Sequence, residues 1–316
     1  MKLKRFAVGF IAAVMAFAVL GTPLGDILPF VRESVATTAG AESYGDYTYR
    51  LRTDSELTGT IEITGYSGNN SELKIIDNIN GNPVTRLADN AFKNCKNLTK
   101  VVVPDSVVNM GDYVFYGCVN LDEINIPDDM NYIGKYSFDN TKILNNQSET
   151  LKYIGNWVID CKNVEDVSIK NGTRGIAGRA FEYCTKLKNI IIPEGVVRIS
   201  VDAFYYCSNL TSITLPDSLK YISWYAFGWC TNLESITIPS GVTWVGDDAF
   251  AYCRKLKSIS IPQGVSQISH WIFYDCTNLE SITIYDGIEF IGIYAFYDCT
   301  KLKEIAIPSS VKSIQK

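Results

Sequence analysis

Nine cysteines recur along the chain, and their thiols are candidates for covalent bonding or metal binding. The residues are Cys95, Cys118, Cys161, Cys184, Cys207, Cys230, Cys253, Cys276 and Cys299. In an exported protein they could form disulfides or hold a metal ion. If successive coils stack them about 4.8 Å apart, their parallel Cβ vectors leave the Cβ atoms too far apart for a normal disulfide. No Cys-x-x-Cys pair occurs, so a zinc site is not expected. We predict nine free thiols in a buried ladder of small apolar side chains.

The single histidine, His270, could act as a catalytic base. No serine or cysteine nucleophile with a fixed partner is indicated, so we expect His270 to be exposed and without a catalytic role. The carboxylates of Asp112, Asp247 and Asp248 fall at positions that the repeat leaves free. We expect them on a solvated face and not in an acid–base pair. The sequence therefore predicts no enzymatic activity, no metal site and no cofactor.

Aromatic residues form three sets, each at a fixed sequence distance from a phenylalanine, isoleucine or valine that recurs about every 23 residues. The first set lies two residues after a repeated phenylalanine: Tyr183, Tyr206, Trp229 and Tyr252. The second lies two residues before it: Tyr113, Tyr136, Tyr225, Trp271 and Tyr294. The third precedes a repeated isoleucine or valine: Tyr221, Trp244 and Phe290.

Stacked coils would align each of these sets into a stripe, and exposed aromatic stripes favour a binding role. The alternative is an outer layer of rings packed over neighbouring coils. Our candidate binding residues for a protein or glycan ligand are Tyr183, Tyr206, Trp229, Tyr252, Tyr225, Trp271 and Tyr294.

A stripe of hydroxyl side chains is expected on the outward positions of the repeated strand. It comprises Ser212, Thr214, Ser235, Thr237, Ser258, Ser260, Ser281 and Thr283. Solvated residues that favour strands explain this stripe without a ligand. A hydroxyl-rich strip that contacts a partner is the alternative.

One repeated phrase must position all of these residues. Its clearest copy contains Ala226, Phe227, Cys230, Leu233 and the Ile-x-Ile-Pro run that ends at Pro239. The aligned phenylalanines are Phe92, Phe115, Phe138, Phe181, Phe204, Phe227, Phe250, Phe273 and Phe296. A period of 23 residues is typical of a leucine-rich-repeat solenoid, which is one continuous body without a single globular core.

The phrase predicts the local structure of each coil. Ile-x-Ile alternates and indicates a short strand, which the following proline ends. Val-x-x-Ile forms the return side. The three-residue spacing of Phe, Cys and Leu fits a short α or 3₁₀ segment with these side chains inward. We therefore predict a right-handed leucine-rich-repeat solenoid of about ten coils, with short parallel strands, turns or short 3₁₀ or α segments, and a β-rich N-terminal cap.

Three segments depart from the repeat. Residues 1–41 have a basic start and an apolar run, as in a signal peptide, with an uncleaved N-terminal anchor as the alternative. Residues 42–74 are expected to form the N-terminal β cap, as two strands with a turn at Gly65 to Asn70, before the array of 75–316. One shortened repeat is expected at about 138–160, with Val158 or Ile159 in the phenylalanine position and a kink at 141–153.

Composition and charge narrow the classes of partner. The formal net charge is −5, the isoelectric point is about 5.1, and 47% of residues are hydrophobic. A disordered chain is excluded, and no basic stripe for nucleic acid exists. Contact with a membrane is expected only through the N-terminal segment.

The repeat resembles that of the bacterial cell-surface BspA-like (Treponema pallidum-type) leucine-rich-repeat proteins, over about residues 73–316. The copies Leu210-x-x-Ile213-x-Leu215-Pro216 and Leu279-x-x-Ile282-x-Ile284, each followed by Ala-Phe-x-x-Cys, carry the resemblance. The resemblance implies a secreted or surface-attached protein that binds host proteins, matrix or other cells. The alternative is a spacer that presents or stabilises a partner protein.

Overall fold

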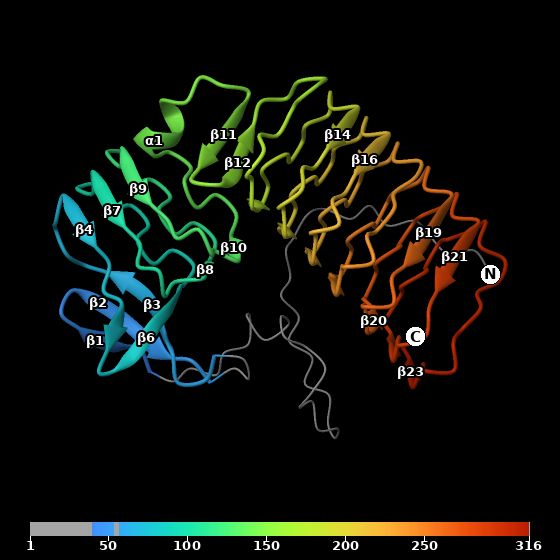
Figure 1. Cartoon of the computed structure of the whole chain (residues 1–316), viewed down its shortest axis with the longest axis horizontal. Coiled ribbons are helices and arrows are strands. Elements are labelled where there is room, and N and C mark those ends of the chain that lie inside the picture. The colour runs from blue at the N-terminus through green and yellow to red at the C-terminus, as the bar shows by residue number, and fades with distance from the viewer. Residues whose placement is uncertain (1–39, 54–56, 316) are drawn as a thin grey trace, which may run out of the picture. The chain divides into compact units, whose positions relative to one another are not determined.

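The chain winds into a solenoid of about 11 turns with about 23 residues per turn, as the repeat predicts (Figure 1). The computed structural model describes residues 40–53 and 57–315. The export segment predicted at 1–41 therefore lies outside the described residues, except for Gly40 and Ala41.

The Ile-x-Ile segments form one side of the coils, as short parallel strands. These are β4 (Glu72–Lys74), β7 (Lys100–Val102), β9 (Glu123–Asn125), β14 (Asn189–Ile191), β16 (Ser212–Thr214), β19 (Ser258–Ile261) and β21 (Ser281–Ile284). Ile190 pairs with Ile213, and Ile259 pairs with Ile282. The strand register therefore equals the 23-residue period, so identical repeat positions stack on one another.

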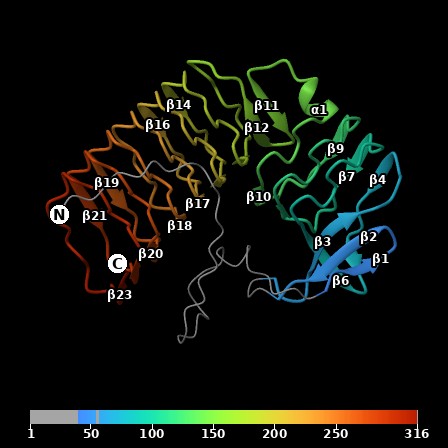
Figure 2. The same cartoon turned by 180° about the vertical axis from the view of Figure 1, so that it is seen from behind.

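The return segments form a second row of parallel strands, which Figure 2 shows from behind. They are β6 (Asn82–Leu87), β8 (Asn109–Met110), β10 (Tyr132–Ile133), β13 (Gly175–Ile176), β15 (Arg198–Ile199), β17 (Tyr221–Ile222), β18 (Trp244–Val245), β20 (Gln267–Ile268), β22 (Phe290–Ile291) and β23 (Ser313–Ile314). A short strand, β5 (Asn78–Ile79), pairs antiparallel with β6. Ile199 pairs with Ile222 at the same 23-residue offset.

The segment around each repeated phenylalanine forms turns with hydrogen bonds three residues back, so the structure shows the predicted turn alternative and not a short helix. In the coil of Phe227, the N–H groups of Tyr225, Phe227 and Trp229 donate to carbonyls of the next coil. The intervening N–H groups, such as that of Gly228, donate three residues back within the coil. Left-handed residues two positions before and two after the phenylalanine produce this alternation, because a right-handed helix cannot pass through them.

The core consists of stacked phenylalanines surrounded by the repeated Leu, Ile, Val and Cys side chains. Every repeated phenylalanine from Phe92 to Phe273 has an exposed fraction of 0%. The ring centroids from Phe181 to Phe296 are 4.7–5.8 Å apart, with interplanar angles of 10–14°. The inward positions predicted for Phe, Cys and Leu are confirmed.

The N-terminal segment is a β cap, but residues 42–74 contain four strands, including β4, instead of the two predicted. Its antiparallel strands are β1 (Glu42–Tyr44), β2 (Tyr47–Leu51) and β3 (Ile61–Tyr66). β3 pairs in parallel with β6 and so continues the return row. The turn expected from Gly65 begins later, because Gly65 and Tyr66 still belong to β3.

An antiparallel hairpin replaces the shortened coil expected at about 138–160. This segment contains a one-turn helix, α1 (Lys142–Asn145), followed by β11 (Leu151–Ile154) and β12 (Trp157–Cys161). Val158 pairs with Ile176 in the return row, so it does not occupy the phenylalanine position. The core is divided here into two hydrophobic clusters.

Within the described part of the chain, no helix is long and apolar enough to cross a bilayer.

Candidate functional site

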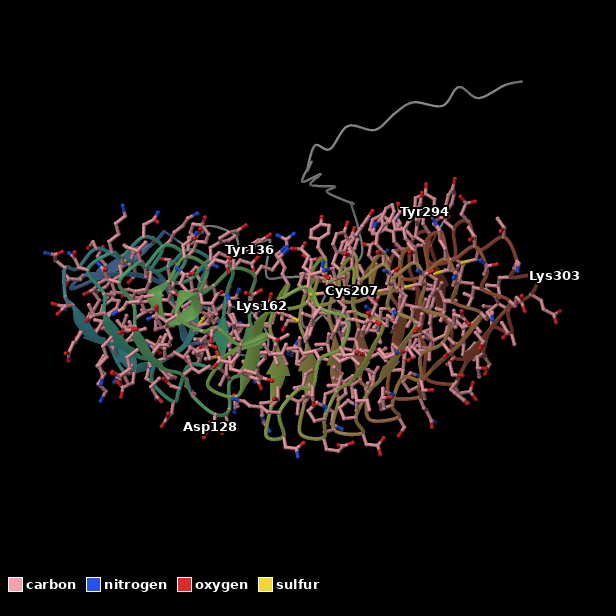
Figure 3. All side chains as sticks on the ribbon, turned by 90° about the horizontal axis from the view of Figure 1, so that it is seen from above. Asp128, Tyr136, Lys162, Cys207, Tyr294 and Lys303 are labelled. Carbon is pink, nitrogen blue, oxygen red and sulfur yellow. The ribbon has the colours of Figure 1, made fainter. Side chains whose placement is uncertain are left out.

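Nine aromatic rings form a continuous row of ring contacts along the turn side of the coils, which we call the aromatic ladder. Its members are Tyr183, Tyr205, Tyr206, Tyr225, Trp229, Tyr252, Tyr274, Tyr294 and Tyr297. Figure 3 shows Tyr136 and Tyr294 along one edge of the stacked coils and Asp128 along the opposite edge. Tyr294, at one end of the ladder, therefore lies on the edge opposite Asp128.

The rings contact one another mainly through their faces in the middle of the ladder. Trp229 and Tyr252 have centroids 4.0 Å apart with an interplanar angle of 18°, and Tyr206 and Trp229 are 5.7 Å apart at 29°. The guanidinium carbon of Arg254 lies 5.5 Å and 5.7 Å from the Trp229 and Tyr252 centroids. Arg254 also forms an ion pair with Asp275 at 2.6 Å. The central ladder thus presents ring edges and one guanidinium to solvent.

The backbone holds many ladder side chains outward through left-handed residues. Tyr225 and Trp229 have φ angles of 51° and 61°, and Tyr294 has a φ angle of 52°. Bulky side chains rarely adopt this conformation. The neighbouring phenylalanine points into the core, so the aromatic pair on either side of it is directed to the surface.

The first predicted aromatic set forms a continuous row of ring contacts from Tyr183 to Tyr252, tilted between Tyr183 and Tyr206 and stacked beyond Tyr206. The second set is divided, because Asp248 occupies the equivalent position between Tyr225 and Trp271. Trp271 contacts His270, while Tyr225 and Tyr294 join the ladder through other tyrosines.

Those other tyrosines are Tyr205, Tyr274 and Tyr297, which sequence reasoning missed. Each lies one residue after the repeated phenylalanine, where the intervening coils carry Gly228 and Ala251. The 23-residue spacing of Tyr274 and Tyr297 was the available signal.

The third predicted aromatic set lies on the return side and forms no row of its own. Trp244 contacts Trp224, and Phe290 contacts His270. Tyr221 lies 4.1 Å from the guanidinium carbon of Arg198. These contacts fit the alternative of an outer layer packed over neighbouring coils.

Carboxylates lie beside the ladder, and burial shifts their protonation. Burial raises the pKa of Asp248 to about 7, while its hydrogen bond with the Tyr225 hydroxyl acts in the opposite direction. Burial also raises the pKa of Asp202, although Lys135 and Arg179 oppose this shift. The Lys135 Nζ atom lies 3.4 Å from Asp202 Oδ2. Asp248 is 9% exposed, so the solvated face predicted for it is wrong.

His270, Asp112 and Asp247 accept backbone hydrogen bonds from the following coil. Asp112 Oδ1 accepts the N–H of Lys135 at 2.8 Å, and Asp247 Oδ1 accepts the N–H of His270 at 2.9 Å. His270 Nδ1 accepts the N–H of Ile293 at 2.9 Å. The exposed position predicted for His270 is therefore wrong, because its side chain is half-buried. Its ring nitrogen accepts the backbone N–H of the following coil, so that this donor has a hydrogen-bond partner.

All nine cysteines are free, and seven of them are buried. In six coils the Sγ atom lies 3.0–3.2 Å from the carbonyl oxygen of the preceding coil's phenylalanine. Burial raises the pKa of Cys118 and Cys299 to about 12. Cys95 and Cys161 are half-buried, so the predicted ladder is fully enclosed only in the regular coils.

The predicted hydroxyl stripe is present and exposed on the first strand side. Its residues pair coil to coil, as Ser258 does with Ser281 and Ser260 with Thr283. All eight side chains are exposed. This stripe faces solvent without an aromatic or apolar anchor within it.

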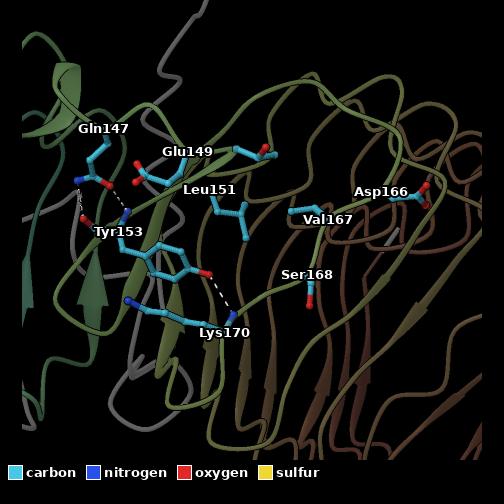
Figure 4. A pocket seen from close by; sticks show the side chains of 9 residues that line it. Gln147, Glu149, Leu151, Tyr153, Asp166, Val167, Ser168 and Lys170 are labelled. Atoms are coloured by element: carbon cyan, nitrogen blue, oxygen red, sulfur yellow. Dashed lines mark hydrogen bonds between the residues drawn. The ribbon is translucent and has the colours of Figure 1, made fainter.

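A hollow of about 650 Å³ lies at the irregular repeat (Figure 4). The Gln147 side chain fixes one wall, because it accepts the Tyr153 N–H and donates to the Tyr153 carbonyl, both at 2.8 Å. The Lys170 Nζ atom lies 3.9 Å from the Tyr153 ring centroid and covers one face of that ring. Glu149 and Asp166 also line the hollow.

Across residues 40–53 and 57–315, no three His, Cys, Asp or Glu side chains come together in an arrangement that could hold a metal ion.

Comparison with known proteins places these features in a family. A family profile described as "BspA type Leucine rich repeat region (6 copies)" matches residues 85–211 and 197–316. Comparison with curated proteins gives no match.

Several solved structures are similar to the chain. A leucine rich cell surface protein from Faecalibacterium prausnitzii A2-165 shares 23% identity over 78% of this chain and 95% of its own, with a TM-score of 0.41. The leucine rich repeat protein of T. pallidum shares 24% identity over 84% of this chain and 92% of its own, with a TM-score of 0.32. A leucine-rich repeat protein from Bacteroides ovatus shares 22% identity over 86% and 90%, with a TM-score of 0.34.

Proposed function

The chain belongs to the family of BspA-type leucine-rich-repeat proteins, and from this premise we propose that it is an extracellular interaction module whose aromatic ladder binds a protein or glycan. The observation that carries the proposal is the continuous row of nine rings, five of them exposed and four half-buried, along the stacked coils. Aromatic side chains are enriched among residues that dominate binding energy. Their fixed backbone keeps the entropy cost of ordering them on binding low.

Two further features support this proposal over a catalytic role or an intracellular role. Burial raises the pKa of the cysteine thiols, and this suppresses the thiolate that nucleophilic catalysis needs. The chain begins with Lys2, Lys4 and Arg5, followed by the uncharged run from Phe6 to Leu20, a pattern typical of export.

The test compares ligand binding by the full chain and by ladder variants on arrays of glycans and of matrix and cell-surface proteins. Tyr206→Asn combined with Trp229→Asn removes the central stack, and asparagine tolerates the left-handed conformation of both positions. Thr214→Asn combined with Thr237→Asn, on the exposed hydroxyl stripe, is the matched control. We expect the ladder variant to lose at least about tenfold in affinity and the control to bind normally. Equal binding by both variants contradicts the proposal.

A further inference from the structure

The last coil contains a pair of tyrosines whose counterpart elsewhere in the chain already holds a cation. Tyr113 and Tyr116 lie two residues before and one residue after Phe115, with ring centroids 5.5 Å apart at 68°. Lys93 Nζ lies 5.0 Å from the Tyr113 centroid and 5.4 Å from the Tyr116 centroid. A corner of this geometry is therefore able to receive an ammonium group.

The same pair recurs as Tyr294 and Tyr297 around Phe296, with centroids 5.4 Å apart at 82°. Lys93 directly follows Phe92, the phenylalanine of the coil before the first pair. Tyr274 directly follows Phe273 and so holds the equivalent position before the second pair. Tyr274 stacks on Tyr297 with centroids 5.1 Å apart, so it adds a third ring where the first corner has its lysine. Tyr294 and Tyr297 are each 48% exposed.

The charges around the second corner favour a cation. Asp298 follows Tyr297 directly, is exposed, and forms no ion pair with a described residue. Other carboxylates beside the phenylalanines are already paired or buried: Asp202 Oδ2 lies 3.4 Å from Lys135 Nζ, Asp275 pairs with Arg254, and Asp248 is 9% exposed. The basic groups that do approach this row, such as Arg254, are already paired. Asp298 is therefore the carboxylate beside this corner that is left to pair with an incoming cation.

We propose that the corner formed by Tyr294, Tyr297 and Asp298 binds a lysine side chain of a polypeptide partner, on the exposed ring surface that Tyr274 does not cover. This inference rests on the proposed function and names the chemistry of the partner at one end of the ladder. A polypeptide is favoured over a neutral glycan here because the exposed Asp298 carboxylate pairs with an ammonium group, which a neutral sugar does not carry.

The test uses a labelled peptide, acetyl-Gly-Lys-Gly-Lys-Gly-amide, with the full chain, and measures binding by fluorescence anisotropy at about 0.15 M salt. The matched peptide carries Nε-acetyl-lysine, which keeps the length and removes the charge. We expect binding of the first peptide only. Tyr294→Asn, Tyr297→Ala and Asp298→Asn should each weaken it at least about threefold.

Two control variants separate the corner from general attraction to an acidic protein. Tyr113→Asn makes the same substitution as Tyr294→Asn, but in the corner that Lys93 already occupies. Asp286→Asn removes an exposed negative charge outside the ladder. Both should bind the peptide normally. Unchanged affinity in Tyr294→Asn and Tyr297→Ala, or equal loss in the controls, overturns the inference. Tighter binding of phosphocholine than of the lysine peptide also overturns it, because the partner would then be a quaternary ammonium headgroup.

The two proposals fail in different ways. If Tyr206→Asn with Trp229→Asn abolishes binding of an array ligand while the Tyr294 and Tyr297 variants bind that ligand and the peptide normally, the interaction role stands and the lysine site falls. If the ladder variant binds the array ligand as well as the unmodified chain does, the interaction role itself falls.

Discussion

Individual side chains beside the ladder occupy positions that are unfavourable for them in isolation. Asp248 is the clearest case, because its carboxyl is buried in the column of left-handed residues that elsewhere holds Tyr225 and Tyr294. Its partner is the Tyr225 hydroxyl, and Asp247 and Asp202 lie near enough to disfavour a further negative charge. The ionised form is therefore penalised in the folded state, which links stability to pH.

The folded pKa of Asp248 is about 7, above its ordinary value of 3.8. Between these values the unfolded chain is ionised and the folded chain keeps its proton, so this carboxyl makes the protein less stable as pH rises from about 4 to 7. We expect Asp248→Asn to stabilise the protein by about 1–4 kcal/mol at pH 8 and by much less at pH 4. Urea unfolding at both pH values measures this difference, with Asp286→Asn as the control for loss of one charge. A constant difference between pH 4 and pH 8 would refute the assignment.

Residue types alone reveal part of the ladder. The tyrosines and tryptophans two residues after the phenylalanine could be found, because four of them follow one another without interruption from Tyr183 to Tyr252. Tyr205, Tyr274 and Tyr297 could not be found in this way, because glycine and alanine interrupt their column. The buried state of Asp248 was also hidden, since a carboxylate at a free repeat position is normally solvated.

At the scale of the element, the turn segment beside each phenylalanine is defined by its two left-handed residues. The sequence contained a signal for them: the same two columns hold Asn90, Asn94, Gly117, Asn140 and several aspartates. These residue types tolerate positive φ. The three-residue spacing of Phe, Cys and Leu nevertheless fits a helix, and spacing alone does not report the sign of φ.

Two substitutions at Trp229 separate the free-energy cost of its positive φ angle from the contribution of ring stacking. Trp229→Val and Trp229→Asn both remove the stack with Tyr206 and Tyr252, but valine is branched at Cβ and disfavours the φ of 61°. We expect the valine variant to be less stable than the asparagine variant by about 1–2 kcal/mol in chemical denaturation. Equal stabilities would show that the segment relaxes to a right-handed conformation, in which case the next coil would lose the hydrogen bond donated by the Trp229 N–H.

At the scale of the whole molecule, the repeat predicts one uninterrupted stack of similar coils. The structure instead has the hairpin β11–β12 between two groups of coils. Side chains alternate along β12, so Trp157 and Ile159 face one side of the strand and Val158 faces the other. Trp157 and Ile159 belong to the cluster that contains Phe138, whereas Val158 belongs to the cluster that contains Phe181. The sequence located this irregularity through the 43 residues between the two phenylalanines, but it could not show that an antiparallel hairpin fills the space.

Repeat arrays unfold by regions when the contact between neighbouring units is weak, and a core divided by a hairpin is such a place. We expect hydrogen exchange followed by mass spectrometry to report two cooperative regions, one on each side of β11–β12. Ile159→Ala should raise exchange mainly in residues 61–145, and Val158→Ala mainly in residues 175–299, because each deletes methyl groups from one cluster only. The adjacent positions serve as controls for each other, since both side chains are buried in the same strand. If either substitution accelerates exchange equally on both sides, the hairpin transmits stability between the clusters, and the solenoid unfolds as a single unit.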